Sequence, residues 1–244
     1  MQNAELKYQI QMLKTLEANV AENRSGENRK FVLFFLFFIF FFHAASAHVI
    51  PFDLSKLSIA DVSWIYLKLG FTHILPLGLD HILFVLGIFF LNPKLKPVIW
   101  QATAFTVAHS ITLGLSMYGI IKPASTIVEP FIAFSIAFVA IENMMIKQLN
   151  WWRLLIVFCF GLIHGCGFAG ALSELGLPPN DYLFSLVFFN LGVELGQITV
   201  ILLAFLLVGK WFGEKVWYRR RIVMPVSFTI ACIALYWTLE RIFS

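Results

Sequence analysis

The stretch YLFSLVFFNLGVELGQITVILLAFLLV, residues 182–208, contains a single charged residue, Glu194. Because a helix needs about 20 mostly apolar residues to cross the hydrocarbon core of a bilayer, this stretch predicts a membrane-spanning helix. Stretches of similar character occur at residues 73–92, 98–120, 125–146, 152–172 and 222–242. The sequence therefore predicts an all-α fold, a polytopic membrane helix bundle with about six transmembrane helices.

The composition of the whole chain supports this class. Of the 244 residues, 59% are hydrophobic and 13% are charged, whereas soluble domains have about 25% charged residues. A disordered chain would need far fewer apolar residues, and a nucleic-acid-binding domain would need a basic surface. We therefore expect the lipid bilayer as the main partner and no nucleic acid.

The N-terminal region has the pattern of a secretory signal peptide. Arg29 and Lys30 precede an apolar run at residues 31–42, and the small-residue sequence His43-Ala-Ala-Ser-Ala47 follows it. A basic region, a short apolar region and an A-x-A site together predict cleavage, here after Ala47. The expected organisation is an N-terminal extension and signal peptide (1–47), a periplasmic or interfacial segment (48–70) and a six-helix transmembrane domain (71–244).

The distribution of basic residues predicts the orientation of the helices. If the mature N-terminus lies outside, the inner loops hold nine Lys or Arg residues and the outer side holds four. The inner group comprises Lys94, Lys96, Lys147, Arg153, Lys210, Lys215, Arg219, Arg220 and Arg221, and the outer group Lys56, Lys68, Lys122 and Arg241. Since cytoplasmic loops are enriched in Lys and Arg, we expect a multi-pass protein of the bacterial inner membrane with its mature N-terminus outside.

Ionisable residues inside the predicted spans are the candidate functional residues. Such a side chain costs at least about 2.5–3.5 kcal/mol at the centre of a membrane helix, so it needs an internal partner. The ionisable set includes His73, Asp80, His81, His109, Glu129, His164 and Glu194, and further polar groups are Ser110, Asn190 and Gln197. An interhelical hydrogen bond could satisfy any one of them, and a shared site could satisfy several.

Helical spacing brings some of these residues together. Asn190, Glu194 and Gln197 stand at positions i, i+4 and i+7 and form one polar stripe along their helix. His73 and Asp80 would share a face of a continuous helix, but the intervening Pro76 and Gly78 predict a break. The depth of these positions along the predicted spans allows the polar groups to meet in one place.

Histidine and carboxylate side chains are ligands for divalent nickel, cobalt, zinc, copper or iron. We therefore expect a site for a divalent metal ion, with no cofactor and no catalytic residue. The candidate ligands are His73, Asp80, His81, His109, His164 and Glu194, while Ser110, Glu129, Asn190 and Gln197 would line the path or orient the ligands.

Several stretches resemble the HupE/UreJ family of hydrogenase and urease accessory membrane proteins. They are HILPLGLDHILF (73–84), TAFTVAHSITL (103–113), VEP (128–130), FGLIHGCGFA (160–169) and FNLGVELGQ (189–197). The resemblance implies a six-span permease whose substrate is nickel or cobalt, and it places Asp80 and His81 in the family signature with His73 as its first histidine. Better understood members carry His-Pro-x-x-Gly-x-Asp-His, whereas Pro76 here lies three residues after His73, which indicates a second branch of the family.

The sequence leaves three functions open. The expected one is a permease for a divalent transition metal, nickel or cobalt, with zinc or copper as alternatives, and the absence of a Walker A motif argues against ATP binding by a P-loop. An intramembrane metal-dependent hydrolase is the second, although HExxH spacing is absent. A non-transporting metallocentre assembly factor is the third, and homo-oligomerisation or contact with metallocentre maturation proteins is compatible with each.

Overall fold

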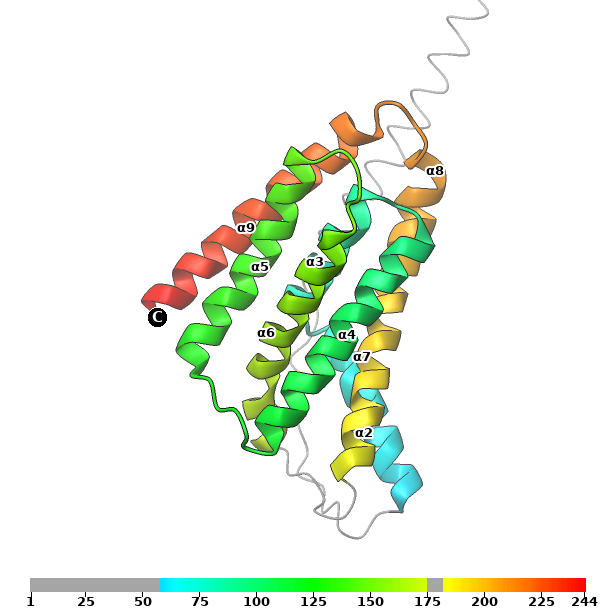
Figure 1. Cartoon of the computed structure of the whole chain (residues 1–244). Coiled ribbons are helices and arrows are strands. Elements are labelled where there is room, and N and C mark those ends of the chain that lie inside the picture. The colour runs from blue at the N-terminus through cyan, green and yellow to red at the C-terminus, as the bar shows by residue number, and fades with distance from the viewer. Residues whose placement is uncertain (1–57, 175–181) are drawn as a thin grey trace, which may run out of the picture. The chain divides into compact units, whose positions relative to one another are not determined.

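The computed structural model describes residues 58–174 and 182–244, and these residues form helices and loops without a strand. The predicted signal peptide and its cleavage after Ala47 lie outside the described residues. The helices are α2 (Ile59–Ile74), α3 (Leu79–Leu91), α4 (Leu95–Met117), α5 (Ser125–Met145), α6 (Trp152–Glu174), α7 (Tyr182–Ala204), α8 (Lys210–Phe212) and α9 (Met224–Phe243). Two π-helical turns, η2 (Phe205–Gly209) and η3 (Arg219–Val223), extend α7 and α9 (Figure 1).

The lengths and hydropathy of these helices confirm the predicted bundle. Five helical segments are long and apolar enough to cross a membrane: Leu95–Met117, Ser125–Met145, Trp152–Ala169, Leu183–Phe212 and Arg219–Phe243. Helices α2 and α3 pass the same test as a pair, with a bend of 67° between them. If the bent pair is one broken span, the described residues contain six spans, as the sequence predicts.

The break between α2 and α3 confirms the role predicted for Pro76 and Gly78. Helix α2 ends at Ile74 and α3 begins at Leu79. A side chain at Gly78 would collide with the backbone carbonyl of His73, so the chain can fold back this tightly only with glycine there. His73 therefore belongs to α2, whereas Asp80 and His81 belong to α3, and the predicted span 73–92 is interrupted near its start.

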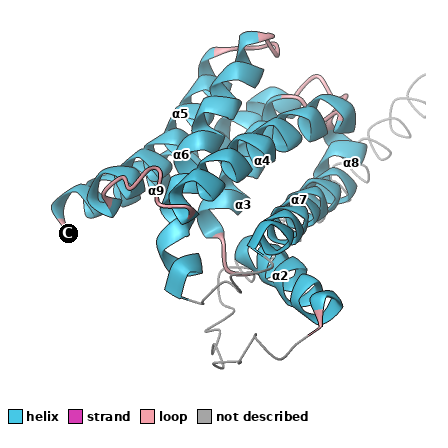
Figure 2. Ribbon diagram, turned by 60° about the horizontal axis from the view of Figure 1, so that its bottom comes forward, coloured by secondary structure: helices cyan, strands magenta, loops and turns pink. Residues whose placement is uncertain are grey.

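Three helix pairs make the most extensive contacts, α2 with α7, α4 with α6 and α5 with α9, and Figure 2 shows α2 and α7 side by side. Glycine permits the close approach of α2 and α7. A Cβ atom at Gly70 would meet the carbonyl oxygen of Phe189, and one at Gly192 would meet that of Leu67. Small residues at helix contacts are typical of membrane bundles. The placement of residues 58–70 at the membrane interface stays a prediction, and the structure shows most of them packed along α7.

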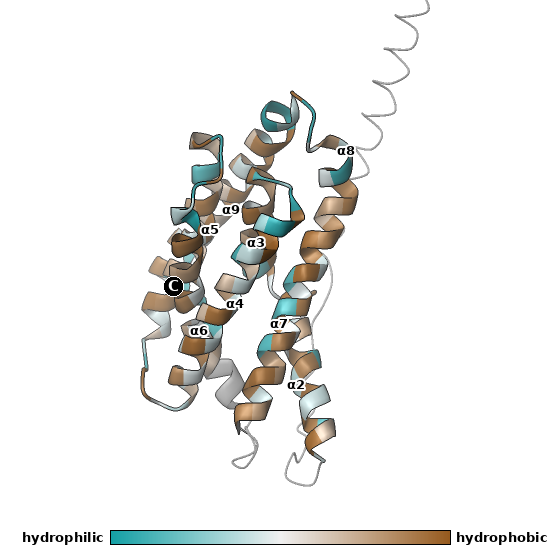
Figure 3. Cartoon of the chain, turned by 45° about the vertical axis from the view of Figure 1, so that its right-hand side comes forward, coloured by the Kyte–Doolittle hydropathy of each residue, from teal (hydrophilic) through white to brown (hydrophobic). Residues whose placement is uncertain are grey.

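The outer surface of the bundle is apolar, as Figure 3 shows by the predominance of brown on its helices. Large exposed hydrophobic residues include Trp64, Phe131, Leu155, Phe184 and Phe228. An apolar surface of this extent would be unfavourable in water and is suited to lipid. Several polar side chains are nevertheless buried in the bundle, among them His109, Asn143, His164 and Gln197, and Figure 3 shows teal interrupting α7 part-way along its length.

Candidate metal centre

Three histidines from three helices meet inside the bundle. His73 lies in the last turn of α2, His81 in the first turn of α3, and His109 past the middle of α4. A nitrogen of each ring lies within 4.8 Å of a nitrogen of both others. The ring centroids of His73 and His81 are 4.7 Å apart, and His109 lies 6.3 Å from His73 and 5.9 Å from His81. The break between α2 and α3 makes this arrangement possible because it turns His81 back toward His73. We call these three residues the histidine triad.

The Nε2 atoms of the triad are buried. Each is inaccessible to solvent and has no hydrogen-bond partner among the described residues. A buried polar atom without a partner costs free energy, so three such atoms on neighbouring rings require an explanation. A divalent cation held by three imidazole nitrogens would satisfy all three at once.

Asn190 on α7 determines which nitrogen of His109 can bind a metal. The Asn190 Nδ2 group donates to the carbonyl of Leu186 at 2.8 Å, and this bond directs Oδ1 toward His109. The distance from Asn190 Oδ1 to His109 Nδ1 is 3.2 Å. Because an amide oxygen can only accept, Nδ1 of His109 donates the proton and Nε2 carries the lone pair. The predicted role of Asn190 in orienting a ligand has this geometric basis.

Replacing Asn190 with leucine is expected to lower the affinity of the purified protein for Ni²⁺ by about 10–100-fold, the usual effect of removing a group that orients a metal-binding histidine. Asn190→Asp is expected to retain most of the affinity because a carboxylate also accepts from Nδ1. Isothermal titration calorimetry would measure both variants. Equal losses in the two variants would show that Asn190 acts through packing alone.

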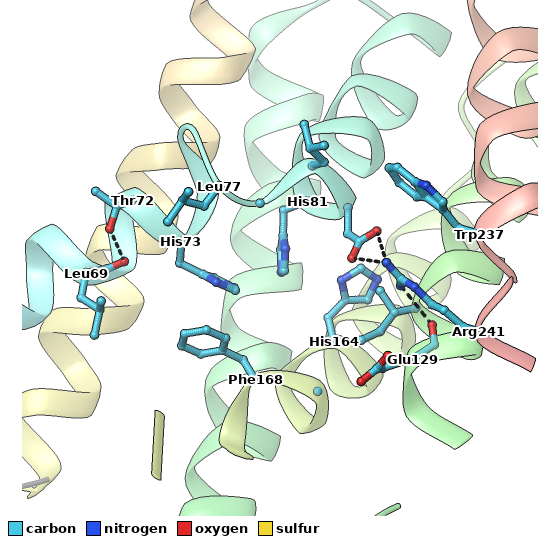
Figure 4. A pocket seen from close by; sticks show the side chains of 15 residues that line it. Leu69, Thr72, His73, Leu77, His81, Glu129, His164, Phe168, Trp237 and Arg241 are labelled. Atoms are coloured by element: carbon cyan, nitrogen blue, oxygen red, sulfur yellow. Dashed lines mark hydrogen bonds and ion pairs between the residues drawn. The ribbon is translucent and has the colours of Figure 1, made fainter. Parts of the chain in front are cut away.

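His164 on α6 lies beside the triad. Its ring centroid is 5.1 Å from that of His81, and Figure 4 shows His81 between His73 and His164. The Ser135 hydroxyl donates to the carbonyl of Ile132 at 2.7 Å and accepts from His164 Nε2 at 2.8 Å. This leaves Nδ1 of His164 with the lone pair, buried and without a partner among the described residues. His164 is therefore prepared to bind a metal next to His81 but stands outside the triad.

A cavity of about 940 Å³ adjoins these rings. His73, His81 and His164 line it together with Asp80 and the exposed Glu129. Trp237 and Arg241 near the end of α9 complete its polar side, as Figure 4 shows. The cavity is lined by the break between α2 and α3, the first turns of α5, the second half of α6 and the last turns of α9.

Asp80 does not point into the triad. Both of its carboxylate oxygens accept from Arg241 Nη2, at 3.1 and 3.0 Å, and Arg241 Nη1 donates to the backbone carbonyl of Glu129 at 3.2 Å. The pair is only partly buried, with 23% of Arg241 and 26% of Asp80 exposed, so solvent reaches it. Asp80 therefore anchors α9 to α3 at the cavity, and its role as a metal ligand stays a prediction.

The remaining candidates lie where α4 faces α7. Glu194 Oε1 accepts from the Thr103 hydroxyl at 2.5 Å, and Gln197 Oε1 accepts from the Thr106 hydroxyl at 3.1 Å. Ser110 donates to the backbone carbonyl of Thr106 at 2.6 Å and so has a local partner. The predicted stripe of Asn190, Glu194 and Gln197 therefore lies against α4. Asn190 contacts the triad directly, whereas Glu194 and Gln197 form a separate group.

A family model described as HupE / UreJ protein matches residues 51–241. The chain belongs to the HupE/UreJ family. The match includes every residue of the triad, His164 and both members of the Asp80–Arg241 pair. No curated protein and no solved structure matches the chain.

In this HupE/UreJ protein, the structure also contains a buried arginine that sequence reasoning assigned to an inner loop. Arg153 near the start of α6 is fully buried. It donates to Glu142 at 2.6 Å and to Asn143 at 3.0 Å on α5, to Gln101 at 3.2 Å on α4, and to the carbonyl of Gly87 at 3.4 Å on α3. The four contacts join four helices, so Arg153 is a structural centre and not a free loop charge.

Sequence reasoning also missed residues whose roles depend on distant partners, and their local signals were weak. Ser135, Thr103 and Thr106 are single hydroxyls within apolar spans, where a bond to the preceding helical turn is the ordinary use. The i, i+3 spacing of Thr103 and Thr106 is a signal only when it is compared with Glu194 and Gln197 at the same spacing. Nothing near Arg241 in the sequence indicates a partner 161 residues away.

Proposed function

We propose that this protein is a permease for a divalent transition metal ion, with nickel as the expected substrate and cobalt as the nearest alternative. The observation that carries the proposal is a cluster of three histidines whose ligand nitrogens lie within 4.8 Å of one another and whose buried Nε2 atoms have no partner among the described residues. The family resemblance supports nickel or cobalt, and the imidazole set alone also suits zinc and copper.

The donor set suits a transported ion better than a permanent structural one. Structural zinc sites have four protein ligands, often with thiolates, and hold the metal tightly. Here the triad supplies three neutral nitrogens. His164 lies near enough to His81 for the ion to pass from one of these two rings to the other. Multi-site binding of moderate strength permits both entry and release, which transport requires.

The cavity supplies a route to the triad in this proposal. Glu129 and Asp80 bring negative charge to its wall, and such charge raises the local concentration of cations. The Arg241 side chain offsets part of it while it pairs with Asp80. Both Asp80 oxygens accept from Arg241, so an ion that binds Asp80 directly must displace the Arg241 side chain. In this proposal, the ion breaks the Asp80–Arg241 pair on its way through the cavity. The inner-membrane location and the outward orientation of this cavity belong to the same proposal.

Metal accumulation in cells tests the proposal. The chain would be expressed in a bacterial host lacking its own nickel uptake, supplied with trace Ni, Co, Zn, Cu, Fe and Mn. We expect selective accumulation of nickel or cobalt with the wild type, and its loss in His81→Ala at equal membrane abundance. Asp80→Ala is expected to reduce accumulation because it removes negative charge from the cavity wall. Phe131→Ala on the lipid-facing surface serves as a control.

The outcomes separate the alternative functions. Accumulation of no metal, with nickel still bound to the purified protein at the triad, would contradict the permease and favour an assembly factor. Metal-dependent hydrolysis by the purified protein that His81→Ala abolishes would favour the hydrolase. Accumulation that survives replacement of each triad histidine would place the transport path elsewhere.

A further inference from the structure

Four oxygen-bearing side chains form a second polar cluster beside the triad. Thr103 and Thr106 on α4 face Glu194 and Gln197 on α7, both pairs at i, i+3 spacing. Thr106 precedes His109 by three residues and Glu194 follows Asn190 by four, so the cluster lies about one helical turn from the triad. On the predicted orientation, that turn is on the inner side. We call these four residues the oxygen cluster.

The oxygen cluster has unused bonding capacity inside the membrane. Oε2 of Glu194 is inaccessible to solvent and has no partner among the described residues. The Gln197 side chain is fully buried, with an exposed fraction of 0%. A carboxylate oxygen left without a partner at this depth costs more than a neutral group, which indicates a cationic ligand.

The other direction inward from the triad is closed by aromatic side chains. Phe84 and Phe105 are fully buried, and their ring centroids lie 5.3 and 5.0 Å from that of His164. Phe105 also contacts His81 at 5.8 Å. Beyond them, the oxygens of Glu142, Asn143 and Gln101 accept hydrogen bonds from Arg153. A metal ion moving that way would meet apolar rings and then a resident cation.

We propose that the oxygen cluster is a second binding site for a divalent cation. An ion that leaves the triad would pass through this site along the contact between α4 and α7. The proposal rests on the permease function and extends it. Carboxylate, amide and hydroxyl oxygens bind nickel more weakly than imidazole nitrogens do, so an ion that moves from nitrogen to oxygen ligands becomes easier to release. The ion would then leave the protein from the weaker of the two sites.

Ligand preference provides the test, because oxygen sites accept Mn²⁺ readily whereas an all-imidazole site favours nickel. Mn²⁺ binding to the purified full chain in lipid nanodiscs would be followed by electron paramagnetic resonance, and Ni²⁺ binding by calorimetry. We expect Glu194→Gln and Thr103→Val each to weaken Mn²⁺ binding, Glu194→Gln by at least about tenfold, because the charged ligand is lost. We expect Ni²⁺ binding at the triad to stay within about twofold of the wild type in both variants, which also shows that they are folded.

The reciprocal variants complete the design. His81→Ala is expected to weaken Ni²⁺ binding and to leave Mn²⁺ binding intact, and Thr199→Val on α7, which bonds only to its own helix in the described part of the chain, serves as the matched control. Unchanged Mn²⁺ binding in both Glu194→Gln and Thr103→Val would overturn the proposal, and so would an equal loss of Mn²⁺ binding in His81→Ala. Failure of the wild type to carry metal would refute the permease, while the Mn²⁺ result would still decide whether the second site exists.

Discussion

Replacing His81 with alanine is expected to lower the affinity of the purified protein for Ni²⁺ by on the order of 100-fold or more, beyond the 10–100-fold cost of losing an orienting partner. His81 is the central ring of the site: its centroid lies 4.7 Å from that of His73, 5.9 Å from that of His109 and 5.1 Å from that of His164. Removing it leaves His73 and His109 as a pair and separates His164 from both. Calorimetry or equilibrium dialysis with Ni²⁺ would measure the loss.

Two further measurements make this expectation specific. Free imidazole is expected to restore part of the affinity of His81→Ala, because it can enter the space that the side chain vacates. His164→Ala is expected to cause a smaller loss, within about tenfold, because His164 lies outside the triad and acts as a neighbour. An unchanged affinity in His73→Ala, His81→Ala and His109→Ala would refute the triad as the nickel site.

The fold could be predicted because membrane spans follow from one local property of the sequence, the length of its apolar stretches. Long apolar stretches of sufficient length form helices in a bilayer, where backbone hydrogen bonds must be satisfied within the segment. The break at Pro76 and Gly78 could also be read locally, since proline cannot continue the helical hydrogen-bond pattern. What the stretches could not show was that the segment before the break packs along α7.

The candidate site was predicted as a set of residues, and its internal arrangement was not. Asp80 and His81 are neighbours in sequence, which suggested that they act together on one ion. Consecutive residues of a helix point about 100° apart, so His81 faces the triad while Asp80 faces α9. The structure accordingly gives Asp80 to Arg241, and only tertiary packing could reveal this division.

The same limit explains the misinterpretation of Arg153. A basic residue at the start of a predicted span satisfies the positive-inside rule, and this rule counts residues without asking where their side chains point. The partners of Arg153 come from three other helices, and two of them, Glu142 and Asn143, look like ordinary polar residues at a helix end. Long polar side chains near span ends are therefore the positions where a local reading is weakest.

Loss of Arg153 is expected to have the largest effect on stability. Arg153→Met leaves Glu142 without a counter-charge in a buried position, and breaking a buried ion pair in this way typically costs about 3–5 kcal/mol. Arg153→Lys is expected to be intermediate, because a single ammonium group cannot reproduce the four directed contacts of the guanidinium. Unfolding of the purified variants in mixed micelles with increasing denaturing detergent would measure the free energies, with Arg220→Met on the exposed surface as the control.

The double variant Arg153→Met with Glu142→Met distinguishes an ion pair from simple packing. Removing both charges abolishes the need to solvate either, so the double variant is expected to recover much of the stability that Arg153→Met loses. A loss in the double variant equal to the sum of the two single losses would contradict this account and show that the side chains act independently. Nickel binding at the triad would be expected to persist in the double variant, since the contacts of Arg153 with Glu142, Asn143 and Gln101 do not include a triad histidine. Stability and metal binding would then be separable properties of the same bundle.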